Sequence, residues 1–163
     1  MLRHLVNLLL WVLPPTRLFA LRWWLLRLAR IDLSENVSFC GRGWVYGRGS
    51  LSIGKNTWIS PGAVFHTHQQ ASISLGSNCD VGPGAEFITG GHVIGDMTRR
   101  AGVGTAKPIT IGDGCWIGAR SAILGGVAIG HGCVIAAGSV VIHDVPPNSL
   151  VAGVPARVKR KLD

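Results

Sequence analysis

A six-residue repeat runs through most of this chain and constrains its fold more than any other feature. An apolar residue recurs every six positions in three groups, often followed by glycine: Ile53, Ile59 and Phe65; Leu75, Val81 and Phe87; Ile111, Ile117, Ile123, Ile129, Ile135 and Val141. Small residues stand four places after most of these: Thr57, Ala63, Cys79, Ala85, Cys115, Ser121, Cys133 and Ser139. Six residues are too few for a helix and its turn, but they suit one short strand and a corner. The repeat therefore predicts an all-β solenoid with three strands per coil and an apolar interior.

Two interruptions break the register. Four extra residues separate Phe65 from Leu75, and a longer excursion at 94–108 separates Phe87 from Ile111. The longer segment is rich in glycine, ends at a proline and carries two adjacent arginines. It is predicted to be a loop that leaves the solenoid, and loops on a rigid scaffold often carry function.

Charge divides the chain into three parts. The net charge of +8 comes mainly from residues 1–33 and from the last seven residues, while the middle is close to neutral. We therefore expect an N-terminal apolar and basic segment at 1–33, a solenoid at 34–145 and a basic tail at 146–163. Basic residues do not alternate with aromatic ones along a strand, so nucleic acid is not an expected partner.

Three of the four cysteines occupy small, inward positions of the repeat. Cys115 and Cys133 are 18 residues apart, so their side chains are expected to stack in successive coils, and Cys79 occupies the equivalent place earlier. The chain has no C-x-x-C spacing. These thiols are therefore predicted to be core residues rather than metal ligands or nucleophiles, and reduced thiols suit a cytoplasmic protein.

His92 stands out among the six histidines because of its position. It follows Gly90 and Gly91 where the repeat breaks off, so it is expected at the start of the long loop and partly exposed. Histidine exchanges a proton readily near neutral pH, which suits a general base. Considered without its neighbours, His92 would equally be an ordinary surface histidine.

The residues around His92 resemble a known family. Gly91-His92, the segment 108–119 (PITIGDGCWIGA), the segment 135–141 (IAAGSVV) and the segment 145–157 (VPPNSLVAGVPAR) are similar to bacterial hexapeptide-repeat sugar O-acetyltransferases, including the maltose, galactoside and colanic acid types. The resemblance covers about residues 50–160. It implies a left-handed parallel β-helix, a homotrimer, acetyl-CoA as the donor and His92 as the catalytic base.

The same resemblance implies roles for further residues. The imidazole of His92 needs an orienting partner, for which Asp96, Glu86 and a backbone carbonyl are the candidates. The family holds coenzyme A in a groove between subunits, which here would be lined by the small residues Gly118, Ala119, Ala136, Ala137 and Gly138. Arg157 and Lys159, with Arg160 nearby, are expected near the nucleotide phosphates. Trp116 would form a wall of the groove or pack at the trimer interface.

The acceptor side departs from the galactoside enzymes, which carry polar residues including Asn in the coils before the histidine. This chain has Ile59-Ser60-Pro61-Gly62 and then His66-Thr67-His68-Gln69-Gln70. His66, His68 and Arg99 are the candidate acceptor contacts, and free galactoside or maltose is not expected as the substrate. A zinc site like that of the γ-type carbonic anhydrases is the alternative for these histidines. Its ligand spacing is absent here, so no metal is expected.

The N-terminal segment is apolar and basic. Residues 2–13 are almost entirely apolar, Pro14-Pro15 interrupts them, and 16–30 resume a helical pattern with Arg22, Arg27 and Arg30 on one side. Each piece is shorter than the roughly 20 residues that span a bilayer. A signal peptide and a helix pair packed on the end of the solenoid are the alternatives. The favoured interpretation is a pair of interfacial helices on the cytoplasmic leaflet of the plasma membrane.

The sequence thus leads to two hypotheses of different classes. The first is an acetyl-CoA-dependent O-acetyltransferase that acts at the inner face of the membrane on a sugar hydroxyl of a polysaccharide or lipid-linked glycan precursor. The second is a non-catalytic β-solenoid scaffold that associates with membranes. Affinity for coenzyme A separates them.

Overall fold

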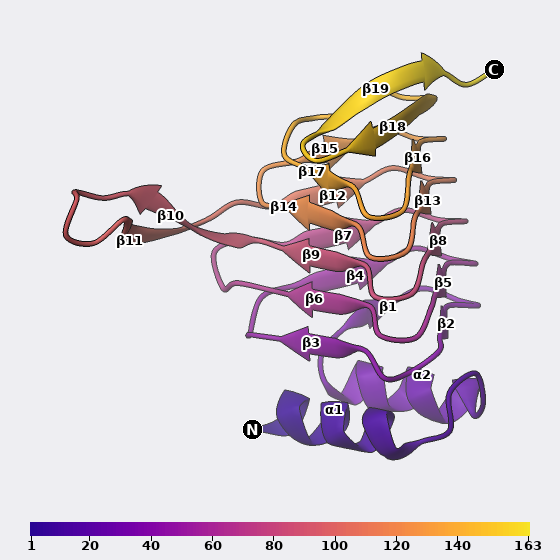
Figure 1. Ribbon diagram of the computed structural model, residues 1–163. Coiled ribbons are helices and arrows are strands. Elements are labelled where there is room, and N and C mark those ends of the chain that lie inside the picture. Colours follow the sequence, from indigo (N-terminus) through magenta and orange to yellow (C-terminus); the bar gives the residue numbers. More distant parts are fainter.

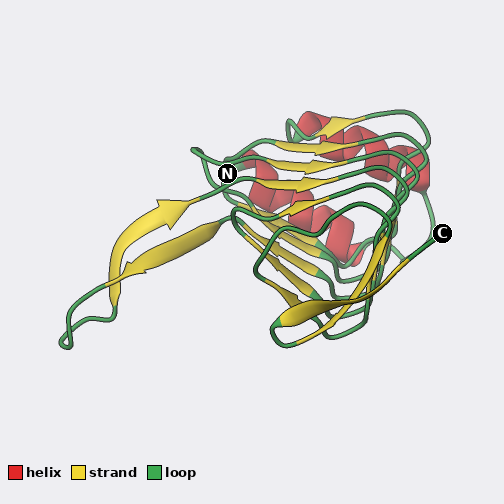
Figure 2. Cartoon of the chain, turned by 90° about the horizontal axis from the view of Figure 1, so that it is seen from above, coloured by secondary structure: helices red, strands yellow, loops and turns green.

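The computed structural model describes residues 1–163 and shows a triangular solenoid of parallel strands (Figures 1 and 2). The first sheet contains β1 (Asp32–Leu33), β4 (Leu51–Ile53), β7 (Ile73–Leu75), β12 (Ile109–Ile111) and β15 (Ala128–Ile129). The second contains β2 (Ser38–Phe39), β5 (Trp58–Ile59), β8 (Asp80–Val81), β13 (Trp116–Ile117), β16 (Val134–Ile135) and β18 (Ser149–Gly153). The third contains β3 (Trp44–Tyr46), β6 (Val64–His66), β9 (Glu86–Ile88), β14 (Ala122–Leu124) and β17 (Val140–Val141). This arrangement confirms the predicted left-handed parallel β-helix.

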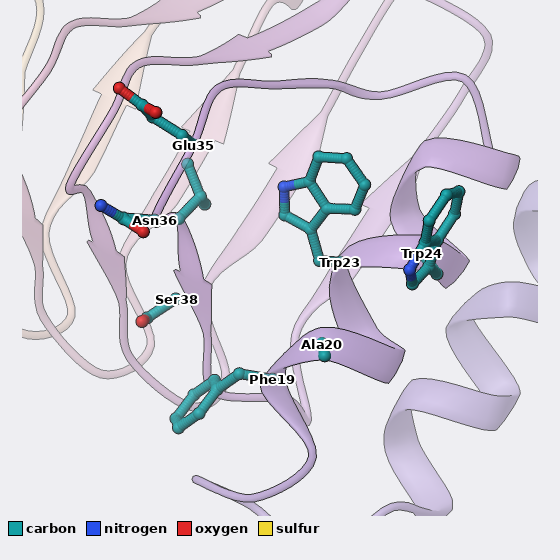
Figure 3. Close-up of a pocket in the computed structure, with 8 residues that line it drawn as sticks. Phe19, Ala20, Trp23, Trp24, Glu35, Asn36 and Ser38 are labelled. Atoms are coloured by element: carbon teal, nitrogen blue, oxygen red, sulfur yellow. The ribbon is translucent and has the colours of Figure 1, made fainter.

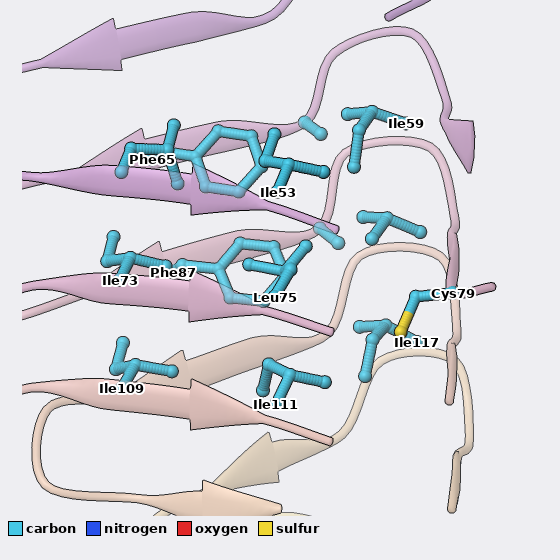
Figure 4. Packing of buried hydrophobic residues seen from close by; sticks show 14 of the residues in the cluster. Ile53, Ile59, Phe65, Ile73, Leu75, Cys79, Phe87, Ile109, Ile111 and Ile117 are labelled. Carbon is cyan, nitrogen blue, oxygen red and sulfur yellow. The ribbon is translucent and has the colours of Figure 1, made fainter. Parts of the chain in front are cut away.

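The repeated apolar residues form the core. All twelve residues of the repeat are at most 3% exposed, and each pairs in register with its counterpart in a neighbouring coil. Phe65 and Phe87 stack with their ring centroids 4.9 Å apart (Figure 4). The buried thiols of Cys115 and Cys133 donate to backbone carbonyl oxygens at 3.1 Å, which confirms that these cysteines pack inside the solenoid.

One coil precedes those that the sequence analysis identified. Leu33, Phe39 and Val45 follow the same six-residue spacing and are at most 3% exposed. Two extra residues separate this group from Ile53, which is why the repeat was recognised only from Ile53 onward. The solenoid therefore begins at Asp32, slightly before the expected boundary.

One corner of the solenoid requires a left-handed backbone, which asparagine and glycine adopt most readily. Asn36, Asn56 and Asn78 occupy it in three coils with φ of 56°, 56° and 55°, and Gly114 and Gly132 occupy it in the next two. The Asn36 amide donates to Asn56 Oδ1 at 3.2 Å, and the Asn56 amide donates to Asn78 Oδ1 at 3.1 Å. This amide ladder links successive coils at the corner.

Every insertion lies at a single corner, where the chain passes from the third sheet to the first. Four residues always separate a first-sheet strand from the second-sheet strand after it, and the same holds from the second sheet to the third. The remaining corner grows from residues 47–50 to 67–72 and then to 89–108. Extra residues at this corner leave all three sheets in register.

The two N-terminal helices close one end of the solenoid. The helices α1 (Leu2–Val12) and α2 (Phe19–Leu28) lie across the first coil (Figure 1). Val6, Leu10 and Leu26 join the core, and the Asn7 side chain exchanges two hydrogen bonds of 3.1 Å with the backbone of Val45. The structure thus shows the packed arrangement that the sequence left as an alternative. Neither helix is long and apolar enough to cross a membrane.

Arg22 corrects one part of the N-terminal prediction. The helical pattern groups it with Arg27 and Arg30 on the side opposite the apolar face, but its side chain is fully buried. Its guanidinium donates to the carbonyl oxygens of Leu10, Leu13, Pro14 and Arg17 at 2.8–3.1 Å. Because α1 ends at Val12, its final carbonyls lack helical partners, and a cation there also complements the helix dipole. Burial lowers the pKa of Arg22.

The other end of the solenoid is closed by a hairpin. Residues 146–163 were expected to form a tail, but β18 extends the second sheet beside β16, and β19 (Ala156–Lys161) folds back antiparallel to it. Val151 is buried in the last turn of the core. The basic residues therefore lie on an ordered strand over the final coil.

Replacing Arg22 by Met should lower the free energy of unfolding by about 2–4 kcal/mol, because several buried carbonyl groups lose a charged donor. Denaturation by guanidinium chloride, followed by circular dichroism, measures the change. Arg17→Met is the matched control, because this side chain is exposed, and it should change stability by less than about 0.5 kcal/mol. Equal midpoints for Arg22→Met and the wild type would contradict a capping role.

Candidate functional site

The long interruption of the repeat is a β-hairpin rather than an irregular loop. The strands β10 (Gly90–Ile94) and β11 (Ala101–Ala106) pair antiparallel and project from the solenoid between β9 and β12 (Figures 1 and 2). The hairpin begins before the loop expected at 94–108 and includes His92, which pairs with Gly104. The register shifts between His92 and Ile94. His92 is thus held on a strand rather than on a loose loop.

The imidazole of His92 is oriented by a single backbone group. Its Nδ1 lies 2.9 Å from the carbonyl oxygen of Gly102, which can only accept a hydrogen bond. Nδ1 must therefore carry the proton in the neutral ring, and the lone pair of Nε2 is free. His92 is exposed and lines a hollow of about 200 Å³ at the base of the hairpin. The hollow is lined by Thr89, Gly90, Gly91, His92, Thr105, Lys107, Leu124 and Gly125.

Neither carboxylate that was considered as the partner of His92 contacts it. Asp96 Oδ1 accepts hydrogen bonds from the Thr98 hydroxyl at 2.6 Å, the Thr98 amide at 2.9 Å and the Arg99 amide at 3.2 Å. These hydrogen bonds lower the pKa of Asp96, and the bond from the Thr98 hydroxyl has the largest effect. Glu86 lies 4.0 Å from His66 Nε2. The partner of His92 is instead the backbone carbonyl, the third candidate of the sequence analysis.

The candidate acceptor residues occupy three separate places. His66 lies on the third sheet and stacks on Tyr46 at 5.0 Å, and Tyr46 in turn stacks on Trp44 at 5.6 Å. His68 lies in the neighbouring corner, where its Nδ1 accepts a hydrogen bond from the Gln70 amide at 3.2 Å. Arg99 is exposed at the turn of the hairpin. The structure contains no group of three potential metal ligands, so the zinc alternative has no geometric support.

His66 is nevertheless connected to the hollow beside His92. Its carbonyl oxygen accepts hydrogen bonds from the Thr89 amide at 3.1 Å and from the Thr89 hydroxyl at 2.8 Å. Thr89 lines the hollow directly. No sequence pattern marks Thr89, Thr105 and Lys107 as site residues, because only the hairpin pairing brings the two ends of the insertion together.

The small residues expected to bind coenzyme A gather at a different corner. They stack between the second and third sheets, where the Gly118 amide donates to Ile135 and the Gly138 amide donates to Ala119, both at 2.8 Å. A side chain at Gly118 would meet the backbone nitrogen of Ala137 at 2.5 Å, whereas one at Gly138 would meet no atom within 4 Å. This corner is therefore closely packed at Gly118 and open to solvent at Gly138. Within one chain, it is not the corner that carries His92.

The remaining candidates lie on the second sheet and its hairpin. Trp116 is 59% exposed and pairs in register with Asp80, which pairs with Trp58. These three side chains line one shallow hollow. Arg157 and Lys159 are exposed on β19, beyond the last coil.

A larger hollow, of about 460 Å³, lies between α2 and the first coil. Phe19, Trp23 and Trp24 line it from the helix, and Glu35, Asn36 and Ser38 line it from the coil (Figure 3). The indole of Trp23 donates to the Ser34 carbonyl oxygen at 3.3 Å, and the Arg27 guanidinium lies over its ring. This hollow contains neither His92 nor the small-residue corner.

Comparison with known proteins places this geometry in a family. The family model described as the hexapeptide repeat of succinyl-transferase matches residues 108–142. The crystal structure of the hexapeptide-repeat-containing acetyltransferase of Vibrio cholerae is 32% identical, with a TM-score of 0.77 over 99% of this chain and 91% of that one. A structure of the protein from Vibrio cholerae O1 biovar eltor, complexed with acetyl coenzyme A, is 30% identical, with a TM-score of 0.77 over 99% of this chain and 86% of that one.

Two further relatives cover this chain to different extents. A galactoside acetyltransferase in complex with coenzyme A is 27% identical, with a TM-score of 0.77 over 98% of this chain and 78% of that one. A Staphylococcus aureus (strain MRSA252) protein, itself proposed to be an acetyltransferase, is 40% identical over 121 residues, 74% of this chain and 57% of that protein. The alignments span from 38% to 57% of the length of the first curated relatives.

Asp96→Ala should lower the protection of the Thr98 and Arg99 amides against hydrogen exchange at neutral pH, because the carboxylate that accepts them is lost. The wild type should lose the same protection as the pH falls through the lowered pKa of Asp96, since the ionised carboxylate is the stronger acceptor. Protection factors measured by NMR test both statements. Asp80→Ala removes an exposed carboxylate from the second sheet and should leave these amides unchanged. Protection that is unaltered in Asp96→Ala would contradict a turn-stabilising role.

Proposed function

Since this chain belongs to the hexapeptide-repeat acetyltransferases, we propose that it transfers an acetyl group from acetyl-CoA to a sugar hydroxyl, with His92 as the general base. The observation that carries the proposal is the imidazole of His92, whose Nδ1 lies 2.9 Å from the carbonyl oxygen of Gly102, so that Nε2 has no hydrogen-bond partner, at a residue that lines a hollow. A general base needs an available lone pair in a fixed orientation, and His92 offers both.

The reaction needs one proton relay. His92 Nε2 removes the proton of the acceptor hydroxyl as its oxygen attacks the thioester carbon of acetyl-CoA. The tetrahedral intermediate then collapses, the carbon–sulfur bond breaks, and Nε2 returns the proton to the departing thiolate. The carbonyl oxygen of Gly102 holds the Nδ1 proton throughout and stabilises the imidazolium that forms. The products are the acetyl ester and free coenzyme A.

Acetyl-CoA would bind along the open corner that includes Ala137 and Gly138. The pantetheine arm can approach the backbone there, because a Cβ at Gly138 would contact nothing within 4 Å. Arg157 and Lys159 would meet the nucleotide phosphates, and Trp116 would form the wall of the groove. Relatives of this chain have been solved with acetyl coenzyme A and with coenzyme A, which supports this donor.

The complete site is proposed to lie between subunits of a homotrimer. His92 and the small-residue corner occupy different corners of one chain, so a neighbouring copy must supply one of them. The hairpin also exposes apolar side chains, with Ile94 and Met97 more than 80% exposed and Val93 and Val103 more than half exposed. An isolated two-stranded hairpin is marginal in water, and a neighbouring subunit would cover these side chains.

The acceptor is proposed to be a glycan of surface-polysaccharide synthesis, a polysaccharide or a lipid-linked precursor, at the inner face of the plasma membrane. His66, His68 and Arg99 would contact it around the hairpin. His66 bonds to Thr89 at the edge of the hollow, and its stack with Tyr46 and Trp44 offers an aromatic surface on which sugar rings can pack. The apolar outer faces of α1 and α2 support peripheral contact with the membrane.

His92→Ala should lower kcat for acetyl transfer by about 100-fold or more, because proton removal from the hydroxyl is lost. His92→Asn should lower it similarly while its side-chain amide keeps a donor for Gly102, which separates base catalysis from hairpin stability. Release of coenzyme A, followed with a thiol reagent, measures both rates. His131→Ala removes an exposed histidine from another coil and should leave the rate unchanged. A His92→Ala enzyme at the wild-type rate would refute the assignment.

A further inference from the structure

The helices α1 and α2 each have one face that the fold does not use. On α1, Val6 and Leu10 pack inward, whereas Leu5 and Leu9 are about half exposed and Trp11 is 56% exposed. On α2, Leu26 packs inward, whereas the outward side chains follow helical spacing: Leu21, Trp24 and Leu28, with Trp24 68% exposed. The inward residues of both helices already belong to the core. The outward apolar residues add no buried contact to the folded chain, so they are available to bind another surface.

The charges at this end of the molecule are mostly positive, although Asp32 and Glu35 of the first coil lie beside α2. Residues 1–31 contain five arginines and no acidic residue. Arg22 is buried, Arg3 donates to backbone carbonyl oxygens of the first coil, and Arg27 lies 3.8 Å from Asp32, which leaves Arg17 and Arg30 exposed without an acidic partner. Exposed Trp and Leu side chains bordered by arginine match the interface of an anionic phospholipid bilayer, where each basic residue adds attraction.

The solenoid fixes how far the catalytic group stands from this surface. The helices contact the first coil, through β1, β2 and β3, and the hairpin with His92 leaves the third coil after β9 (Figure 1). Coils are about 4.8 Å apart and a helix layer is about 10 Å thick, so His92 stands on the order of 20 Å from the outermost apolar side chains.

We infer that the helix-covered end binds an anionic lipid surface end-on, and that the coils act as a spacer holding His92 at this height. The inference rests on the proposed function, because it defines where that reaction occurs. An acceptor sugar attached directly to a lipid would lie too close to the bilayer. The substrate is therefore a lipid-linked glycan in which further sugar units separate the acetylated one from the lipid. In a homotrimer with parallel axes, three such ends would bind together and strengthen the contact.

The orientation can be measured with single fluorescent labels. All four native cysteines are buried, so an introduced thiol reacts selectively. Leu9→Cys, Arg100→Cys and Val154→Cys place labels at the helix face, the turn of the hairpin and the opposite end, and all three side chains are exposed. Energy transfer to a dye in vesicles of phosphatidylglycerol and phosphatidylcholine should fall in the order Leu9, Arg100, Val154. Equal transfer from Arg100 and Val154, or strongest transfer from Arg100, would overturn end-on binding.

Two variants test the binding surface itself. Leu9→Glu combined with Trp24→Glu should abolish sedimentation with these vesicles, while Val154→Glu, an equally exposed apolar site, should sediment as the wild type does. Sedimentation of the double variant like the wild type would overturn the docking face. If the face instead joins two copies of the assembly, the wild type should have twice the mass in the absence of lipid and should not sediment with vesicles. That result would also overturn the proposal of a lipid-binding face.

The spacer is tested with a soluble sugar that the wild type acetylates, coupled to a lipid anchor through ethylene glycol spacers of increasing length. On vesicles, the rate should rise at least tenfold once the extended spacer exceeds about 20 Å. A rate independent of spacer length would overturn the height assignment. Failure of the wild type to acetylate any soluble sugar would instead count against the proposed function, and the labelling result would stand separately.

Discussion

The structure depends on the burial of inward apolar side chains in columns that repeat from coil to coil. A single coil buries little, so its stability comes from the coils on either side. The stack of Phe65 on Phe87 is one such contact, and both terminal coils lack a neighbour on one side. The helices α1 and α2 close one end and the β18–β19 hairpin closes the other. The same constraint restricts insertions to a corner, where they leave the columns intact, and the hairpin of His92 is such an insertion.

The features that could be predicted from the sequence depend on spacing along the chain. The inward columns follow from the six-residue register, and so does the burial of Cys115 and Cys133. His92 was identified because it stands where the register ends and because its neighbours match a family motif. The first coil follows the same rule, but two extra residues before Ile53 obscured it.

The features that could not be predicted depend on contacts between distant segments. Arg22 has the spacing of an outward residue. Its side chain is nevertheless buried, because its guanidinium donates hydrogen bonds to carbonyl oxygens at the end of α1 that have no helical partner. Asp96 is close to His92 in sequence, but its nearest donors are Thr98 and Arg99 in its own turn. A six-residue period carries no information about antiparallel pairing, so the sequence predicts a loop where the structure has a hairpin. Without that pairing, the carbonyl of Gly102 cannot be distinguished from the carboxylates as the hydrogen-bond partner of His92.

In the proposed assembly, His92 of one subunit acts on a donor held against the small-residue corner of its neighbour. A crystal structure of the assembled protein with coenzyme A tests this arrangement. We expect a trimer with the pantetheine arm against Ala136, Ala137 and Gly138 of one subunit and the thiol beside Nε2 of His92 from the next. Coenzyme A bound away from His92, or no coenzyme A bound to a protein that crystallises as a monomer, would contradict it.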